Sequence, residues 1–299
     1  MMRLLSPFSG VMNGKPVFDN TRRLVRLAYR AKYYKKVGFS AVGRIPLLTI
    51  ARSHFTFLLP ESSRPAYLTV EFTNYCNLKC SYCTSPLNLR KRGFMSDETF
   101  EVLLHQIKEF DLHRVRIVGN GESTLHPNFA AMVQRLAECC SYLQVVTNGH
   151  YLNAQKIGSL LRAPVRLLEV SVDSDNRQGY EGSRIGGNFD RLLTNLRLLK
   201  EMRQKLGGPT VVNIRVMIRP SQMTRESEIR NFWSSYADTV MPQYVHDYTR
   251  GMDPDVFPHY QVSGLIPRCS VPSKAMTLHW NGTIPLCELS QRQTGMPDG

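Results

Sequence analysis

The sequence predicts an α/β protein whose centre is an open, partial (β/α)6 barrel of the TIM-like kind. Between residues 66 and 250, short runs rich in β-branched and aromatic residues alternate with amphipathic helical stretches about six times. Such alternation is typical of right-handed βαβ units around a parallel sheet. Six units are too few to close an eight-stranded barrel, so we expect the sheet to remain open and curved.

Each unit can be located along the chain. Strands are expected at residues 67–73, 114–119, 142–148, 166–173 and 211–218, and near 244–248. Helices are expected between them, at "DETFEVLLHQIKEF", "NFAAMVQRLAECC", "NAQKIGSLLR", "NFDRLLTNLRLLKEMRQKL" and "TRESEIRNFWSSYA". Ser96 precedes the first of these helices and is a suitable N-cap, with acidic residues in the first turn.

Composition limits the protein class before any motif is considered. The chain has 299 residues, 42% of them hydrophobic, which is enough for one large core with small appendages. The N-terminus lacks the pattern of a signal peptide, and no run of 18 apolar residues occurs. Seven cysteines in such a chain are therefore expected to be reduced, in a cytoplasmic protein. Clustered cysteines there indicate metal or redox chemistry.

The first 62 residues carry a strong positive charge. They hold eleven Lys and Arg against two acidic residues, within a chain of net charge +14. Residues 22–36 are expected to form a basic amphipathic helix, which suits peripheral contact with an anionic membrane or with nucleic acid. The plainer alternative is a solvated helix that covers one end of the next domain, and nucleic acid is not expected as the main partner.

Unusual polar segments follow four of the expected strands. They lie at residues 74–86, 119–124, 147–149 and 171–174. Because the carboxyl ends of parallel strands meet at one rim of a sheet, these segments should converge there. Their shared position predicts one active site at that rim.

Three cysteines in the first of these segments suggest a cluster-binding loop. Cys76, Cys80 and Cys83 are separated by three and then two residues. Three thiolates without a fourth suit a cubane iron–sulfur cluster in which one iron stays open to a small molecule. A structural zinc site is the alternative, and it would need a fourth ligand such as His105 or His126.

The spacing CxxxCxxC directly after a first strand, with Tyr82 before the last cysteine, resembles the cluster loop of radical S-adenosylmethionine (radical SAM) enzymes. The resemblance implies that Cys76, Cys80 and Cys83 hold a [4Fe-4S] cluster whose open iron chelates S-adenosylmethionine. It further implies reduction of that cluster by a partner such as flavodoxin or ferredoxin. Cleavage of S-adenosylmethionine would then yield a 5′-deoxyadenosyl radical that abstracts hydrogen from a substrate.

The same resemblance implies a set of residues that bind S-adenosylmethionine. "NGE" at 120–122 is similar to the family's Gly-Gly-Glu motif, with Asn120 in place of the first glycine, and Glu122 would bind the methionyl amino group. Arg184 resembles an arginine that grips the methionyl carboxylate, the alternative being a surface loop residue. The full implied set is Tyr82, Gly121, Glu122, Asn148, Ser171 and Arg184.

The tail carries a second cysteine pair. Cys269, Gly282 and Cys287 are spaced as at the opening of SPASM and twitch extensions, which hold auxiliary iron–sulfur clusters. The segment "TLHWNGTIPLC" is expected to form a small hairpin after the barrel, turning at Asn281-Gly282. No cysteine follows Cys287, so the extension is expected to be truncated or incomplete, and a second cluster stays an open question.

The predicted organisation is a basic N-terminal segment (1–62), a radical SAM partial barrel (63–250) and the start of a SPASM/twitch-like extension (251–299). The predicted function is a radical SAM enzyme, most simply an oxidoreductase, that acts on a sugar, cyclitol, glycan or peptide. The positive charge weakly favours an anionic substrate. Two other classes stay open, namely an inactive scaffold that binds the cluster and S-adenosylmethionine, and an accessory module acting through residues 1–62.

Overall fold

A computed structural model describes residues 65–87, 90–246, 253–257 and 275–285 of the chain. Three regions of the sequence analysis lie outside these residues. They are the basic helix expected at 22–36, Cys269 and Cys287. No helix among the described residues has the length and apolar character needed to cross a membrane.

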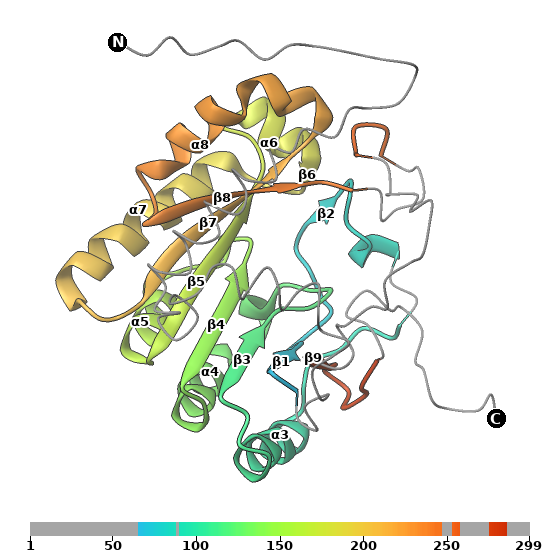
Figure 1. Cartoon of the computed structure of the whole chain (residues 1–299), viewed down its shortest axis with the longest axis vertical. Helices are drawn as coiled ribbons and strands as arrows, with labels where there is room; N and C mark the ends of the chain where they lie inside the picture. The colour runs from blue at the N-terminus through green and yellow to red at the C-terminus, as the bar shows by residue number, and fades with distance from the viewer. Residues whose placement is uncertain (1–64, 88–89, 247–252, 258–274, 286–299) are drawn as a thin grey trace, which may run out of the picture. The chain divides into compact units, whose positions relative to one another are not determined.

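One parallel sheet forms the centre of the described structure. Its strand order is β8-β7-β5-β4-β3-β1-β9, and every neighbouring pair runs parallel (Figure 1). The outer strands β8 and β9 do not pair with each other, so the expected open, partial barrel is confirmed. The strands are β1 (Tyr67–Val70), β3 (Arg114–Ile117), β4 (Tyr142–Thr147), β5 (Val165–Val172), β7 (Val211–Ile218), β8 (Thr239–Tyr244) and β9 (Ala275–Leu278).

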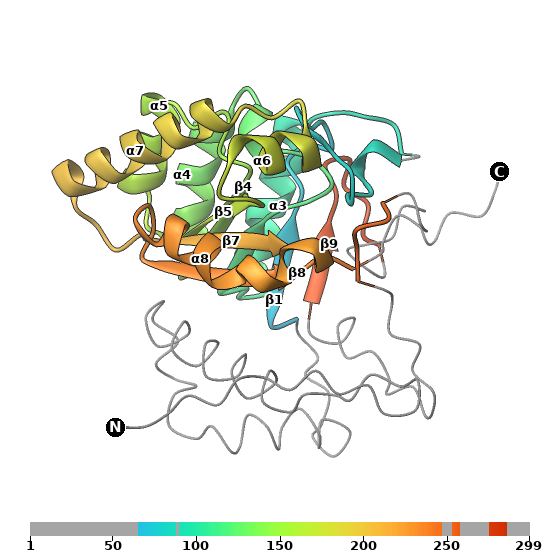
Figure 2. The same ribbon diagram turned by 90° about the horizontal axis from the view of Figure 1, so that it is seen from above.

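Five longer helices follow the outer face of this sheet, as Figures 1 and 2 show. Ser96 caps the first of them as expected, because its side chain accepts a hydrogen bond from the Thr99 N–H at 3.1 Å. The apolar sides of all five helices share one continuous core with the sheet. The helices are α3 (Asp97–Glu109), α4 (Phe129–Cys139), α5 (Ala154–Arg162), α7 (Phe189–Leu206) and α8 (Glu226–Ser234).

The two faces of the sheet differ in chemistry. Side chains alternate along a strand, so Leu68 and Val70 belong to the apolar core under the helices while Thr69 lies on the opposite, inner face. On β5 the inner face carries Glu169 and Ser171, and the chain continues on that side to Asp173. The inner face is therefore polar, and it leads to the rim where the strands end.

Smaller elements near the rim were not predicted. A short helix α6 (Arg177–Ser183) leads into β6 (Arg184–Ile185), which pairs antiparallel with β2 (Lys79–Cys80). Short 3-10 helices are η1 (Ser85–Leu87), η2 (Ser123–Leu125) and η3 (Pro220–Arg225). The two-residue strands are too short for a periodic pattern, yet they attach the cysteine loop to the segment after β5.

Two strands differ from their expected form. β8 begins at Thr239, five residues before the expected position 244, and it contains Pro242. Proline argues against a strand in sequence analysis, but β8 lies at the edge of the sheet, where a missing backbone N–H is tolerated. β9 was expected in a hairpin separate from the barrel, and that expectation is wrong, because β9 pairs with β1 as a seventh strand of the main sheet. The turn itself is present, with Gly282 at φ 83° and its N–H bonded to the His279 carbonyl at 3.0 Å.

Candidate functional site

The loops that follow the strands meet at one rim, as the sequence analysis expected. The N–H of Glu122, after β3, donates to the Tyr75 carbonyl at 2.7 Å. Asn148, after β4, donates its side-chain amide to Asn77 Oδ1 at 2.9 Å. The N–H of Ser81 donates to a carbonyl in α6 at 3.0 Å. The loop that carries the three cysteines is thus attached to each neighbouring loop.

The three cysteines lie half-buried in that loop. A tight turn joins two of them, with the Cys83 N–H donating to the Cys80 carbonyl at 3.1 Å. Backbone N–H groups also approach two sulfurs, Leu78 N at 3.5 Å from Cys76 Sγ and Ser85 N at 3.4 Å from Cys83 Sγ. Backbone N–H groups directed at sulfur stabilise thiolate charge, which a metal-binding loop requires.

The thiols also share one electrostatic environment. Burial raises the pKa of Cys76 to about 11 and that of Cys80 to about 12, and it raises the pKa of Cys83 as well. The Arg184 guanidinium acts in the opposite direction on all three thiols. One cation therefore faces the whole cysteine group, while Glu122 adds a negative charge near Cys76.

The two histidines considered as a fourth zinc ligand are engaged elsewhere. In His126, Nε2 lies 2.9 Å from the Met95 carbonyl, and Nδ1 accepts the Asn128 N–H at 3.1 Å. His105 is exposed on α3 and faces Glu109 at 3.6 Å. Among the described residues, no three His, Cys, Asp or Glu side chains are grouped to hold a single metal ion. A cubane cluster sets a different requirement, since each thiolate binds its own iron.

The segment after β3 needs glycine at two positions. A Cβ at Gly121 would lie under 3.0 Å from the Thr73 and Tyr75 carbonyl oxygens, and one at Gly119 would meet the Glu71 side chain as closely. Asn120 lies between them, with its N–H bonded to Glu71 Oε2 at 2.9 Å. The departure from Gly-Gly-Glu at position 120 is therefore accommodated, because the close approaches fall on its neighbours.

Glu122 is buried and held in place by several donors. Its Oε1 accepts hydrogen bonds from the Thr124 hydroxyl at 2.6 Å and the Thr147 hydroxyl at 2.8 Å. Its Oε2 accepts the Asn148 N–H at 2.7 Å. A carboxylate oxygen offers two acceptor positions, so Oε2 retains one for a further donor such as an ammonium group.

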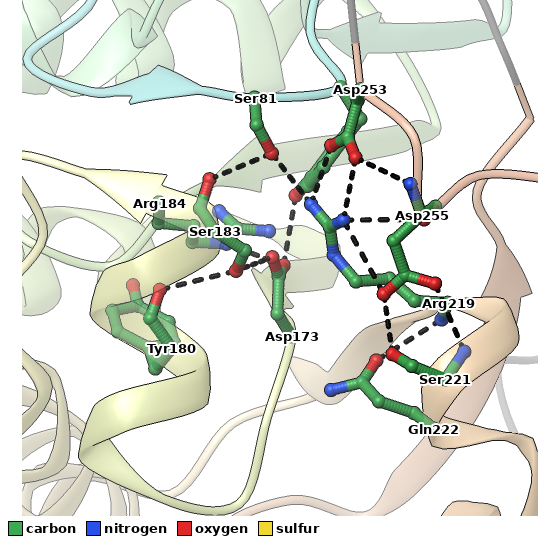
Figure 3. Close-up of polar contacts among 11 residues, drawn as sticks. Ser81, Asp173, Tyr180, Ser183, Arg184, Arg219, Ser221, Gln222, Asp253 and Asp255 are labelled. Carbon is green, nitrogen blue, oxygen red and sulfur yellow. Dashed lines mark hydrogen bonds and ion pairs between the residues drawn. The ribbon is translucent and has the colours of Figure 1, made fainter.

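Asp173 connects the cysteine loop with Arg184 at the end of β5, and Figure 3 shows this arrangement. Its Oδ1 accepts both the Tyr82 hydroxyl at 2.9 Å and Arg184 Nε at 2.7 Å, and its Oδ2 accepts the Ser183 hydroxyl. Arg184 is 3% exposed and pairs with Cys80 through β6 and β2, so the surface-loop alternative for this residue is wrong.

Arg184 and Ser171 both retain hydrogen-bonding capacity. Among the described residues, the only recorded hydrogen bond of the Arg184 side chain is the one from Nε, which leaves its two terminal nitrogens for a ligand carboxylate. Ser171 is half-buried on the inner face, and no hydrogen bond is recorded for its hydroxyl within the described part of the chain. Asn148 donates one amide hydrogen to Asn77, accepts the His150 N–H through Oδ1 and donates its backbone N–H to Glu122.

Sequence reasoning missed three residues of this rim. Asp173 and Arg219 follow buried strands directly, so the rule that active-site groups follow strands could have identified them. His150 is buried beside the Asn148 turn, and its Nε2 accepts the Asn188 N–H at 2.8 Å. Its role depends on a contact with a residue 38 positions away, which no local pattern reveals.

Comparison with known proteins identifies the class to which this site belongs. A sequence model of the Radical SAM superfamily matches residues 70–222, just over half of the 299-residue chain. The chain belongs to the Radical SAM superfamily. Its cofactors are accordingly a [4Fe-4S] cluster and S-adenosylmethionine.

Curated relatives share only part of their length with this chain. A "PqqA peptide cyclase" of Gluconobacter oxydans is 32% identical over 126 residues, which cover 42% of this chain and 34% of the relative. A "GTP 3',8-cyclase" of Limosilactobacillus fermentum is 28% identical over 155 residues, covering 50% and 46%. The chain therefore spans between a third and a half of these relatives.

Two solved structures share the fold. The crystal structure of Streptococcus suis SuiB bound to S-adenosylmethionine has a TM-score of 0.54 at 15% identity, covering 89% of this chain and 72% of SuiB. Native anSMEcpe with bound AdoMet also has a TM-score of 0.54 at 15% identity, covering 76% of each chain. At such low identity these similarities establish the fold alone.

The described residues fit both cofactors. Three free thiols lie on one loop at the rim, with Cys80 paired to Arg184 through β2 and β6, and three thiolates would leave one iron of a four-iron cluster open. Glu122 Oε2 keeps an acceptor position for an ammonium, and Arg184 keeps donors for a carboxylate. These are the two charged groups of an amino acid, and S-adenosylmethionine carries both.

Proposed function

We propose that Cys76, Cys80 and Cys83 hold the [4Fe-4S] cluster and that this chain is an active radical SAM enzyme. The observation that carries the proposal is geometric: the Cys83 N–H donates to the Cys80 carbonyl, and Cys80 pairs through β2 and β6 with the buried Arg184 at the strand-end rim. An inactive scaffold would not need to keep a free carboxylate acceptor and free guanidinium donors beside that loop.

The remaining rim residues would bind S-adenosylmethionine. Glu122 accepts the methionyl ammonium through Oε2, and Arg184 donates to the carboxylate. Ser171 supplies a hydroxyl from the inner face, while Gly121 lets the segment approach the loop backbone. Tyr82, held by Asp173, presents its ring near the adenine, and Asn148 fixes Glu122 and the loop together.

When bound, the cofactors would supply one-electron radical chemistry for hydrogen abstraction from a substrate. The chain's own part is to orient the amino acid group of S-adenosylmethionine and to hold the surrounding loops. The buried pair Arg184–Asp173 keeps a cation and a hydroxyl donor in fixed positions.

A peptide side chain is the substrate class we favour, with modification of that side chain as the net reaction. Support comes from the names of the relatives, since the Gluconobacter oxydans protein is a peptide cyclase and SuiB has been solved with its precursor peptide SuiA. A sugar, cyclitol or glycan is the second class. Oxidoreductase chemistry would fit either.

The organisation into residues 1–62, 63–250 and 251–299 is part of the same proposal. We place a SPASM/twitch-like extension in the last segment, which returns one strand to the barrel sheet as β9. Cys269 and Cys287 would contribute to an auxiliary cluster there, with further ligands from elsewhere. A cytoplasmic location, peripheral membrane contact through 22–36 and a flavodoxin or ferredoxin reductant complete the proposal.

Anaerobic reconstitution tests it directly. The chain should take up about four irons and produce 5′-deoxyadenosine when dithionite and S-adenosylmethionine are added. A variant with Ala at Cys76, Cys80 and Cys83 should lose both properties. The matched control places Ala at Cys139 and Cys140, which pack against the core at the end of α4, and should keep both properties. Iron binding without 5′-deoxyadenosine would favour the scaffold alternative, and a full cluster in the triple variant would refute the assignment.

A further inference from the structure

A second buried guanidinium approaches the cysteine loop from the opposite side to Arg184. Arg219 follows β7 directly and is 8% exposed. Its Nη2 donates to the Ser81 hydroxyl at 2.6 Å, and its guanidinium carbon lies 5.4 Å from the centre of the Tyr82 ring. Both contacts fall on the two residues between Cys80 and Cys83.

The same guanidinium is fixed from the other side by residues that follow β8. Asp253 accepts two hydrogen bonds from it, at 3.1 Å to Oδ1 and 2.9 Å to Oδ2, and the Asp255 carbonyl accepts another at 3.3 Å. Figure 3 shows Arg219 between Ser81 and these two aspartates. Asp255 is itself tied to the turn after β7, where its Oδ1 accepts the Ser221 N–H at 3.0 Å.

The segment 253–257 is also anchored to the edge of the sheet. The Phe257 N–H donates to the Val245 carbonyl at 2.7 Å, and the Phe257 ring packs edge-on against Tyr244 at 5.6 Å. The segment is therefore held by backbone and aromatic contacts outside the cysteine loop, and Asp253 itself also contacts Ser81 of that loop. A guanidinium that makes a bidentate ion pair on one side can hold a hydroxyl on the other in a defined place.

We propose that Arg219 is a positioning residue for the cluster loop, and that Asp253 and Asp255 hold it against Ser81 and Tyr82. This clamp makes the geometry of the cofactor site depend on the chain that leaves the barrel after β8. The expected effect of this clamp on cofactor binding rests on the proposed function. The clamp itself is a property of the polypeptide, and it can be measured without them.

The first test is hydrogen exchange of the chain before reconstitution, monitored in peptides that cover residues 76–87. Replacing Arg219 with Gln and Asp253 with Asn together removes the clamp without leaving a buried charge unpaired. Ser81→Ala is milder, since it removes the hydroxyl that accepts from Arg219, together with the contacts of that hydroxyl with the Ser183 carbonyl and Asp253. Both should speed exchange of these peptides about tenfold, the expected result of losing one charge-assisted hydrogen bond. Arg225→Gln is the control, because Arg225 is half exposed and pairs with Asp175 and Glu228 rather than with the cysteine loop, and it should leave exchange unchanged.

The second test uses the reconstituted protein. Ser81→Ala should keep the iron content of the native chain but bind S-adenosylmethionine about tenfold more weakly. The change that this ligand causes in the EPR spectrum of the reduced cluster should be smaller as well. Arg219→Lys keeps the charge but loses the planar fork, so it should behave like the Ser81 variant.

Native-like exchange of residues 76–87 in both the Arg219→Gln/Asp253→Asn variant and Ser81→Ala would overturn the proposal. Native affinity for S-adenosylmethionine in Arg219→Lys and Ser81→Ala would overturn it as well. These outcomes differ from failure of the proposed function. In that case the native chain would hold no cluster, yet the exchange rates of residues 76–87 would still report on the clamp.

Discussion

Ion pairs at the rim and ion pairs on the outer helices both join an arginine to a carboxylate, but they differ in their exposure to solvent. At the rim, the side chains of Arg184 and Asp173 are 4% and 1% exposed. On the helices, those of Arg135 and Glu101 are 48% and 55% exposed. Desolvation makes an unpaired charge costly at the rim, whereas water and salt screen the helical pair.

The two kinds of pair also differ in what else they hold. Asp173 accepts hydrogen bonds from Tyr82 and Ser183 in addition to Arg184, so one carboxylate joins the cysteine loop, α6 and β6. The contact between Arg135 and Glu101 joins two neighbouring helices, and beyond it the Arg135 guanidinium lies over the Phe100 ring at 5.5 Å. The rim pairs therefore position a site, and the helical pairs contribute to a solvated surface.

The largest effect should follow from Asp173→Asn. An amide cannot accept from three donors as the carboxylate does, and Arg184 would remain buried without a counter-ion. Breaking such a pair costs about 3–5 kcal/mol of unfolding free energy, measured by urea denaturation of the chain before reconstitution. Asp190→Asn, which removes an exposed partner of Arg177, is the control and should change the urea midpoint little. Equal midpoints for the two variants would contradict the comparison.

Gly121→Ala should have the next largest effect. The added methyl group would lie under 3.0 Å from backbone oxygens of Thr73 and Tyr75, which cannot move as a flexible side chain would. Overpacking of this kind costs about 1–3 kcal/mol and should separate the cysteine loop from Glu122. Gly182→Ala is the matched control, since open space surrounds that position. Calorimetric melting of both variants would measure the difference, and similar melting temperatures would refute it.

The sequence was sufficient for the parts of the fold that repeat. Five of the six barrel strands and the five outer helices follow from apolar periodicity, because these strands bury one face under the helices. The rim position of Glu122 and the cysteines followed from strand direction alone. β9 could not be foreseen as a sheet strand, since four residues carry little pattern and pairing with β1 joins positions 208 residues apart (Tyr67 with Ala275).

Residues that position other residues were the hardest to predict. Asp173 and Arg219 matter through contacts with Tyr82, which lies 91 positions before Asp173. Their places after strands could have assigned both residues to the rim, but no spacing rule pairs them with Tyr82, and only the folded sheet brings these side chains together. Residues expected to touch a cofactor belong to short, recognisable motifs, whereas the residues that position them come from distant parts of the chain.

The pH dependence of stability offers a smaller test of the rim. Burial, helped by the charges of Arg184 and Arg191, lowers the pKa of His150 below its ordinary value of 6.5. Its stabilising contribution is therefore complete above pH 6.5 and lost as pH falls through the folded-state pKa, because the unfolded chain binds the proton more readily. His150→Gln should flatten the decline in urea midpoint below pH 6.5, while His105→Gln on exposed α3 should not. Parallel curves for both variants would contradict this.

The smallest effect should come from Glu101→Gln on the outer surface. The Arg135 hydrogen bond lowers the pKa of Glu101, but both side chains are about half exposed, so water replaces the lost contact. We expect no resolvable change in the urea midpoint at moderate salt and only a slight decrease at low salt, where screening is weak. Iron uptake and S-adenosylmethionine binding should be unchanged, because this exposed pair on α3 and α4 makes no contact with the described residues of the rim. A loss comparable with that of Asp173→Asn would show that exposure does not separate the two kinds of ion pair in this protein.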